Sequence, residues 1–381
     1  HCCAGHHDLI GAGDAAAILR MQREPVPLER CEFIRRAALV AATVGTRNLR
    51  ASAVQNLRQR QHAGTAYADE EKGACKQFSR GGKVAHVGAA LLRCGAAGKV
   101  ARERGVTRRI AICAPATPIT REHAEAVSAL AAAEFPELDL LFHEQCFVQD
   151  GHFSGDDGVR LAAFLDCAND PGSEAVWFAK GGYGSNRLLP QAIERLGPAA
   201  RNKAYLGYSD AGFLLGALYR EGIGHPVHAP MVIDIRRSGG QAAVRRTLAW
   251  LAGDESGLER HCDDHPGAAF NLTTLAMLAG TRFMPSLEGH VLMVEEVAEH
   301  LYEIDRLFFH ITELLPSLAG LRLGEVSDVP ENDRPFGADA EGIARDWCKR
   351  AGIAYLGRAE IGHSSANRIV PFGLARRQTR A

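Results

Sequence analysis

Short apolar runs alternate with alanine-rich stretches along the middle of the chain, from residue 109 to about residue 250. The runs at 175–179 and 204–207 have the length of buried strands, and the stretches at 121–134 and 158–167 have the length of helices. This alternation predicts βα units around a mainly parallel sheet. Ligands of such sheets bind beyond the carboxyl ends of the strands, so polar residues that follow a strand are of most interest.

The pattern changes after this region. Residues 253–270 are rich in Asp, His and Gly and indicate a linker, whereas strand and helix signals are mixed over 271–376. We therefore expect an α/β domain at 107–252 and a smaller second domain at 271–376.

Composition narrows the possible functions. With 46% apolar and 7% aromatic residues in 381, the chain can form two ordinary cores. The formal net charge of −1 gives no basis for nucleic-acid or membrane binding. No apolar run reaches the roughly 18 residues that a bilayer-spanning helix needs, and no signal pattern opens the chain, so we expect a cytoplasmic protein.

The ten cysteines show no C-x-x-C spacing and no Cys/His spacing of a metal site. The close histidine pairs, His6-His7 and His225-x-x-His228, do not belong to H-E-x-x-H. We therefore predict neither a metal nor another cofactor. Three cysteines lie in apolar surroundings and are expected to be reduced core residues: Cys113, Cys146 and Cys167.

Ser209 lies between the run 204–207 and an apolar helical stretch, 211–218. A serine on such a strand-to-helix turn has an exposed hydroxyl and backbone N–H groups nearby, the geometry of a nucleophile elbow. The strict form G-x-S-x-G fails, because residue 211 is Ala. The alternative is that Ser209 or Asp210 only caps the helix, a common role for both residue types.

The loop 180–185 (KGGYGS) follows the run 175–179. Its glycines let backbone amides approach a ligand closely, so the loop is a candidate donor to an anion. It matches neither G-x-G-x-x-G nor the P-loop. The alternative is a tight turn after a strand.

Glu295 ends the strand-like run 290–294, and Glu296 alternates to the opposite face, so we expect one of the two carboxylates inside and the other in solvent. His363 follows Gly362 in a polar loop. Ser209, Glu295 and His363 together supply the residue types of a Ser–Glu–His relay. The alternative for His363 is an exposed or merely hydrogen-bonded histidine.

From about residue 108 to residue 376 the chain resembles the LD-carboxypeptidase family, which includes muramoyltetrapeptide carboxypeptidases and microcin C immunity proteins. Seven segments carry the resemblance in the family's order: 110–116 (IAICAPA), 181–184 (GGYG), 207–210 (GYSD), 228–231 (HAPM), 271–281 (NLTTLAMLAGT), 295–306 (EEVAEHLYEIDR) and 362–373 (GHSSANRIVPFG).

The resemblance implies that Ser209 is the nucleophile, His363 the general base and Glu295 the residue that orients it. The N–H of Asp210 and one from the glycine loop, Gly182, would form the oxyanion hole. It further implies a smaller α+β second domain, a homodimer, and removal of the terminal D-alanine from murein tetrapeptide in cell-wall peptide recycling.

An exopeptidase also needs a cation for the terminal carboxylate of its substrate. Our candidates are Lys180, Arg187 and Arg306, although Arg306 has the alternative of an ion pair with Asp305 or Glu299. We also expect three further residues to bind substrate: Tyr183, Glu299 and Tyr302. The chain departs from the family at Lys180, where many members have Arg, and at Ala229, Ala268 and Phe270, which replace glycines.

Two other functions compete. A microcin C immunity peptidase would cleave an aminoacyl-adenylate-like conjugate and would need an aromatic platform, for which Trp250 and Phe270 are the only candidates between residues 236 and 270. A non-catalytic peptide-binding module is the other, although all three relay residues are present.

Residues 1–106 hold 17 Lys and Arg against 9 Asp and Glu and show no clear periodicity, apart from possible helical fragments at 15–23 and 32–44. Three interpretations are open: a poorly ordered basic tail, a partner-binding arm, or upstream sequence translated as though it were coding. We favour the last, because the family resemblance begins only near residue 108.

Overall fold

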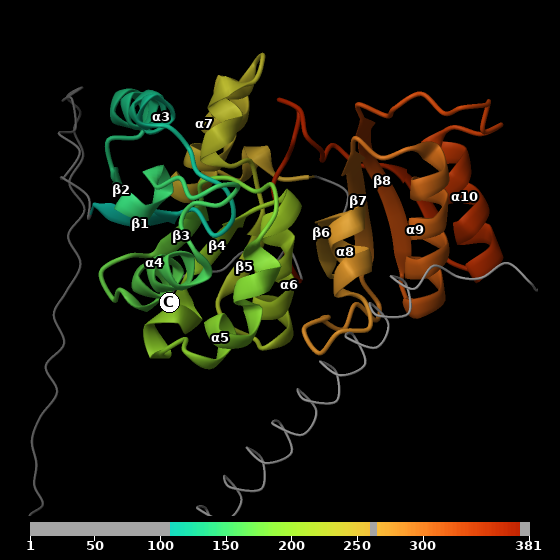
Figure 1. The fold of residues 1–381 in the computed structure, drawn as a ribbon, viewed down its shortest axis with the longest axis horizontal. Coiled ribbons are helices and arrows are strands. Elements are labelled where there is room, and N and C mark those ends of the chain that lie inside the picture. The colour runs from blue at the N-terminus through green and yellow to red at the C-terminus, as the bar shows by residue number, and fades with distance from the viewer. Residues whose placement is uncertain (1–106, 260–264, 374–381) are drawn as a thin grey trace, which may run out of the picture. The chain divides into compact units, whose positions relative to one another are not determined.

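The computed structural model describes residues 107–259 and 265–373. They form two β-sheets (Figure 1). The strand order is β10-β5-β4-β3-β1-β2 in the larger sheet and β6-β7-β8-β9 in the smaller one. The interpretations of residues 1–106, including the two helical fragments, lie outside the described residues.

The larger sheet has five parallel strands, and β10 pairs antiparallel with β5 at one edge. Its strands are β1 (Arg108–Cys113), β2 (Leu138–Phe142), β3 (Ala175–Phe178), β4 (Ala204–Gly207), β5 (His225–His228) and β10 (Val370–Pro371). The helices of this part are α3 (Arg121–Glu134), α4 (Asp157–Asn169), α5 (Leu189–Glu194), α6 (Gly212–Arg220) and α7 (Gly240–Ala252).

The smaller sheet has four strands, all parallel. Helices alternate with its strands in the order β6 (Gly267–Asn271), α8 (Leu272–Leu278), β7 (Val291–Val297), α9 (Leu301–Leu314), β8 (Gly320–Ser327), α10 (Ala340–Ala351) and β9 (Tyr355–Arg358). The resemblance implied an α+β arrangement here. The strands are instead connected by βα units, which makes this part α/β as well.

Local sequence explains where several helices begin. Thr120 forms a capping box with His123 at the start of α3, and the Asp156 carboxylate accepts from Val159 N at the start of α4. Asp339 caps α10 in the same way, and Gly352 ends that helix in the left-handed conformation. These caps satisfy backbone groups that have no partner inside the helix.

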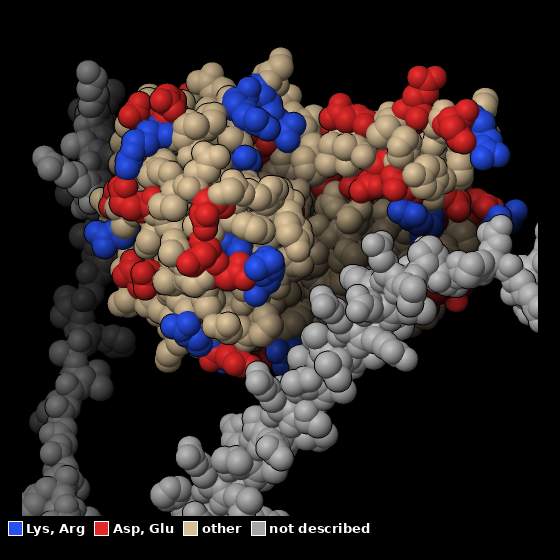
Figure 2. Space-filling view, in the orientation of Figure 1, with Lys and Arg blue, Asp and Glu red and all other residues tan. Residues whose placement is uncertain are grey.

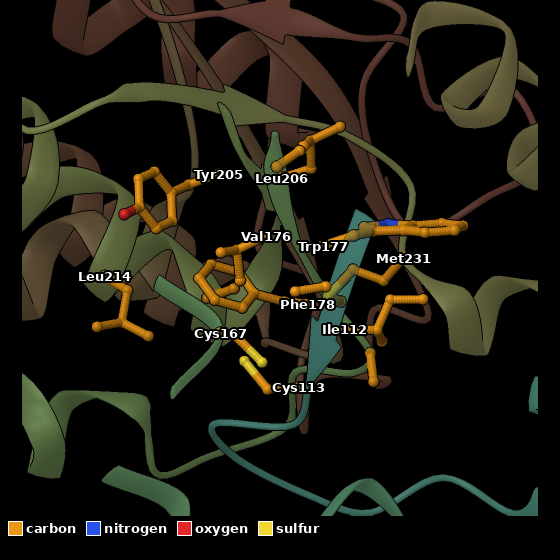
Figure 3. Close-up of a cluster of buried hydrophobic side chains, with 14 of the residues drawn as sticks. Ile112, Cys113, Cys167, Val176, Trp177, Phe178, Tyr205, Leu206, Leu214 and Met231 are labelled. Carbon is orange, nitrogen blue, oxygen red and sulfur yellow. The ribbon is translucent and has the colours of Figure 1, made fainter. Parts of the chain in front are cut away.

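The core of the larger sheet is built on β3 and β4, whose residues are almost all buried. Figure 3 shows the Trp177 ring beside Met231, and the indole N–H donates to the Pro230 carbonyl at 2.9 Å. The predicted core cysteines Cys113, Cys146 and Cys167 are buried free thiols.

The two sheets meet where α6 packs on α8 and β6. Gly212 and Gly216 allow this approach, since a Cβ on Gly212 would lie 3.1 Å from Thr274 and one on Gly216 would lie 3.2 Å from Leu278. The chain then returns from β9 to pair β10 with β5 of the larger sheet. The loop between β9 and β10 therefore links the two sheets.

Most predicted elements of the first sheet are confirmed: 121–134 is α3, 204–207 is β4, and 175–179 contains β3. Within residues 107–259 and 265–373, no helix combines the length and the apolar composition that a membrane crossing requires. On the face shown in Figure 2, basic and acidic side chains are interspersed.

Candidate active site

Ser209 lies on a tight turn between β4 and α6. Its backbone is left-handed, with φ of 58°, a conformation that costs a non-glycine residue about 1–3 kcal/mol and is concentrated at functional sites. A Cβ on Gly207 would lie 2.9 Å from the Phe178 ring, so the start of the turn accepts only glycine without rearrangement. A 3-10 turn, Ser209–Ala211, then leads directly into α6. The predicted nucleophile-elbow geometry is present.

The side chains of Ser209 and Asp210 do not cap the helix. Neither the 3-10 turn nor α6 has a side-chain cap hydrogen bond. The Asp210 carboxylate instead accepts from the N–H groups of Gly184 at 3.1 Å and Ser185 at 3.0 Å. The capping alternative is therefore wrong, because the Asp210 side chain is directed into the neighbouring loop after β3.

That glycine loop lies directly against Ser209. A Cβ on Gly181 would sit 3.3 Å from the Asp210 nitrogen and 3.4 Å from Ser209 Oγ. The Thr117 hydroxyl fixes the loop by donating to the Gly181 carbonyl at 2.6 Å. Among the residues that the structure describes, the N–H groups of Asp210 and Gly182 have no acceptor. Donors beside a hydroxyl form a place where an anion can be held.

Glu295 and His363 form a close pair. His363 Nδ1 lies 2.8 Å from Glu295 Oε2, and the Glu295 side chain is fully buried. Glu295 is part of β7 in the smaller sheet, and His363 lies on the loop between β9 and β10. The alternative of an exposed histidine is wrong, since only 11% of the His363 side chain is accessible.

Glu296 is buried as well, which corrects the expectation that one carboxylate of the pair faces solvent. β7 is an interior strand between β6 and β8, and a bulge interrupts its pairing with β8 between Val294 and Glu296. Glu296 accepts from Asn271 Nδ2 at 2.7 Å and from both the N–H and the hydroxyl of Thr273 at 2.8 Å. These donors satisfy its charge inside the protein.

Burial and charge act in opposite directions on the Glu295–His363 pair. Burial alone would lower the pKa of His363, but the charge and the hydrogen bond of Glu295 outweigh it, so this pKa lies above its ordinary value. Burial raises the pKa of Glu295, and the facing imidazole counteracts that rise. The Glu295 carboxylate therefore stabilises the imidazolium form of His363 when the ring takes up a proton.

Asn367 anchors the loop that carries His363. Its Oδ1 accepts from the Gly362 N–H at 3.3 Å and faces His228 Nε2 at 2.9 Å. His228 is fully buried at the end of β5, and burial lowers its pKa to about 4, so it is neutral. Arg246 on α7 donates to the carbonyl groups of Asn367 and Ser365. The loop is thus held by residues from the larger sheet.

A second group of residues supports the imidazole from the elbow side. The Tyr208 ring centre lies 4.9 Å from that of His363 and 5.5 Å from that of His228. The Tyr208 hydroxyl donates to Asp234 at 2.8 Å, and Arg237 donates to the same carboxylate oxygen at 2.8 Å. Sequence reasoning missed Tyr208, Asp234, Arg237 and Arg246, although Tyr208 is the residue next to the predicted nucleophile.

The structure thus pairs Glu295 with His363 and places the His363 ring against the residue that precedes Ser209. Tyr208, the neighbour of Ser209, contacts the His363 ring, and Thr274 of α8 donates to the Ser209 carbonyl at 3.4 Å. Within the described residues, no hydrogen bond joins the Ser209 hydroxyl to His363. Such catalytic hydrogen bonds are often long without substrate and tighten when it binds.

A cavity of about 760 Å³ opens beside Ser209 between the two sheets. It is lined by the elbow and glycine loop on one side and by residues of α8 and the end of β7 on the other. Two of the predicted substrate-binding residues, Tyr183 and Glu299, line this cavity, whereas Tyr302 does not and stacks on His300 with ring centres 5.2 Å apart.

The predicted cations do not line the cavity. Arg187 pairs with Asp157 at 2.8 Å. Arg306 pairs with Glu303 at 3.0 Å, so the alternative partners Asp305 and Glu299 were wrong; a spacing of three residues on α9 favours Glu303. Lys180 directly precedes the glycine loop, has no ion-pair partner among the described residues, and its pKa is lowered by burial and by Arg236.

Among the described residues, no group of three or more His, Cys, Asp or Glu side chains is arranged to hold a metal ion. His228, one of the paired histidines in the sequence, faces Asn367 instead.

Two family models and several curated proteins match this chain. Residues 110–229 match the model of the LD-carboxypeptidase N-terminal domain, and residues 268–377 match that of the C-terminal domain. A murein tetrapeptide carboxypeptidase of Pseudomonas aeruginosa is 27% identical over 70% of this chain and 91% of its own length. A putative carboxypeptidase of Streptomyces coelicolor is 30% identical over 70% of this chain and 88% of its own.

Solved structures show the same fold. A muramoyltetrapeptide carboxypeptidase from Oxalobacter formigenes has a TM-score of 0.58 at 23% identity and covers 69% of this chain and 93% of its own. The self-immunity protein MccF, in complex with glutamyl sulfamoyl guanosine, also has a TM-score of 0.58, at 17% identity, and covers 71% of this chain and 92% of its own.

Proposed function

Because the chain belongs to the LD-carboxypeptidase family and is a serine-type carboxypeptidase, we propose that it releases the terminal D-alanine from murein tetrapeptide. In this proposal Ser209 is the nucleophile, His363 the general base and Glu295 the residue that orients His363. One observation carries it: a serine held at φ of 58° beside a buried Glu–His pair, at the edge of a cavity.

The geometry supports a two-step reaction. Nδ1 of His363 is engaged by Glu295, so Nε2 is the nitrogen that takes the proton from the Ser209 hydroxyl. Ser209 Oγ then attacks the carbonyl carbon before the terminal D-alanine. His363 passes the proton to the leaving amine, an acyl-enzyme remains on Ser209, and water hydrolyses it by the reverse proton path.

The N–H groups of Asp210 and Gly182 are the proposed donors to the oxyanion of the tetrahedral intermediate. A donor of this kind contributes roughly 3–4 kcal/mol to lowering the barrier. The Asp210 carboxylate supports this role because it ties the glycine loop to the elbow through Gly184 and Ser185. The loop and the elbow therefore keep a fixed spacing before substrate arrives.

Lys180 is the proposed partner of the substrate's terminal carboxylate. Arg187 and Arg306 are held by Asp157 and Glu303, whereas Lys180 has no ion pair among the described residues and adjoins Gly181. Lys180→Met should therefore raise KM for the tetrapeptide by about tenfold or more with a smaller change in kcat. An unchanged KM would remove Lys180 from this role.

The similarity to MccF raises a second candidate, cleavage of an aminoacyl-adenylate-like conjugate. The two aromatic residues available for a nucleobase do not favour it: Phe270 is 1% exposed in the core, and Trp250 lines a different cavity. A cytoplasmic location, a role in cell-wall peptide recycling and a homodimer stay predictions from the sequence.

Mass spectrometry of free murein tetrapeptide tests the proposal. Wild-type protein should remove one alanine residue from L-Ala-γ-D-Glu-meso-diaminopimelate-D-Ala, and Ser209→Ala should not. Removal by both proteins at the same rate would show that Ser209 is not the nucleophile. If neither protein removes alanine but the wild type cleaves an aminoacyl-sulfamoyl nucleoside, the second candidate is correct.

A further inference from the structure

The wall of the cavity beside Ser209 is acidic and apolar. Three carboxylate residues line it, Asp210, Glu296 and Glu299, and no Lys, Arg or His does. The rest of the wall includes a group of apolar side chains: Leu189, Phe213, Met277, Leu278 and Phe283. A cavity with this wall suits a ligand group that has a hydrocarbon stem and a positively charged end.

Two of the three carboxylates already have donors within the protein. Asp210 accepts from the backbone of the glycine loop, and Glu296 accepts from Asn271, Thr273 and the Val297 N–H. Both are almost fully buried. Neither has capacity to spare for a ligand, so they shape the cavity and leave recognition to other groups.

Glu299 is different. It follows β7, is partly exposed, and accepts no hydrogen bond from a backbone N–H in the described residues. Its carboxyl group is hydrogen-bonded to that of the neighbouring Glu303, and Arg306, the cation whose charge acts on Glu299, donates to Glu303. Burial and the neighbouring Glu303 and Glu296 raise the pKa of Glu299 to about 7. A cation in the cavity would relieve this crowding of carboxylates.

A second acceptor lines the same cavity. The amide oxygen of Asn186 is buried and has no donor among the described residues. Glu299 and Asn186 come from different parts of the fold: Glu299 lies in the segment after β7, and Asn186 lies on the 3-10 turn Ser185–Leu188. A donor-rich group such as an ammonium can use both.

We infer that Glu299 binds the side-chain ammonium group of the diamino acid whose carbonyl Ser209 attacks. This inference rests on the proposed function, because it takes the murein peptide as substrate. The side chain of that residue enters the cavity next to the scissile bond, its methylene groups contact the apolar wall, and its ammonium ion meets the Glu299 carboxylate. Glu299 is then a specificity-determining residue that selects a cationic side chain over a neutral one.

Binding to the inactive Ser209→Ala protein tests this without requiring turnover. The two peptides are L-Ala-γ-D-Glu-L-Lys-D-Ala and the same peptide with norleucine, which has the hydrocarbon stem but no ammonium. Calorimetry should give a roughly ten- to hundredfold lower Kd for the lysine peptide, as expected for a hydrogen bond between charged groups. Adding Glu299→Gln should reduce this ratio to about two or less.

Two further variants make the result specific. Glu331→Gln removes the same charge from an exposed position outside the cavity and should keep the full ratio. Glu299→Asp keeps the charge and should restore part of it. Circular dichroism checks that each variant is folded.

The possible outcomes distinguish the role of Glu299 from the proposed reaction. Equal affinity for the lysine and norleucine peptides, or an equal loss of both affinities in Glu299→Gln, overturns the inference. Binding of neither peptide overturns it as well. If the inactive protein prefers the lysine peptide through Glu299 but wild type cleaves no tetrapeptide, the recognition stands and the proposed reaction fails.

Discussion

The two halves of the candidate site are built in different ways. The elbow and the glycine loop follow adjacent strands of one sheet and are joined by short contacts around Asp210. The Glu295–His363 pair joins residues 68 positions apart, and its loop depends on the His228–Asn367 contact, which spans 139 positions. The nucleophile side is therefore a local structure, whereas the base side exists only when the two sheets are assembled.

Removing the imidazole of His363 should have the largest effect on catalysis. His363→Ala should lower kcat for tetrapeptide by about 10⁵–10⁶-fold, because a serine without its base is a poor nucleophile. D-alanine release measures it. His310→Ala, which removes a histidine of α9 that is not part of the proposed relay, should retain wild-type kcat. Substantial activity in His363→Ala would mean that another group takes the proton.

Glu295→Gln should have the next largest effect, a loss of about 10⁴-fold in kcat, because the neutral amide no longer stabilises the imidazolium ion. The pH profile is the sharper measurement. With the carboxylate gone, burial still lowers the pKa of His363, so the acidic limb of kcat/KM should move to lower pH than in wild type. An acidic limb at the same pH as in wild type would show that Glu295 does not act on the group whose titration limits kcat/KM.

The raised pKa of His363 in the wild type determines how activity and stability change with pH. The pKa of His363 is raised, so the neutral base forms at a higher pH than in an ordinary histidine, and kcat/KM falls as pH drops through this pKa. The same shift stabilises the fold below the unfolded-state pKa of histidine. That contribution is lost as pH rises through the higher folded-state pKa.

Asn367→Ala tests the long-range anchor. It leaves the Gly362 N–H and Nε2 of the buried His228 without a partner, which should cost about 1–3 kcal/mol in the free energy of unfolding. We expect kcat to fall about ten- to hundredfold with little change in KM, since His363 loses its fixed position. Ser364→Ala, in the same loop, is the matched control. Equal effects of the two variants would refute the anchoring role.

The smallest expected effect concerns the pH dependence of ligand binding. The pKa of Glu299 is raised to about 7, with Glu296, Glu303 and Arg306 as the charged neighbours that act on it. Below that pH the carboxyl is protonated, so binding of the lysine peptide to Ser209→Ala should strengthen as pH rises from 6 to 8. The norleucine peptide is the control and should not follow this trend.

The two halves of the site also differ in how much of each could be predicted from the sequence. Strand 204–207, the elbow at Ser209 and the glycine loop are local patterns, so they could be predicted from a few consecutive residues. The burial of both Glu295 and Glu296 could not, because it depends on an irregular register between β7 and β8 and on donors from Asn271 and Thr273.

Residues that act through long-range contacts were also beyond local reasoning. Asp234, Arg237 and Arg246 hold the histidine side of the site, but nothing near them in the sequence marks them. Three basic residues were the candidates from the sequence for the cation that binds the terminal carboxylate of the substrate. Two of them form ion pairs: Arg306 with Glu303, which a helical spacing of three residues favours, and Arg187 with Asp157, which lies 30 positions away in the sequence.

The most direct test of the account is to trap its covalent intermediate. Wild-type protein mixed with murein tetrapeptide and quenched in acid within milliseconds should carry the mass of the tripeptide acyl group. Peptide mapping should place that mass on Ser209, and Ser209→Ala should remain unmodified. An acyl group on a different residue, or D-alanine release by Ser209→Ala at the wild-type rate, would contradict the central claim that Ser209 is the nucleophile.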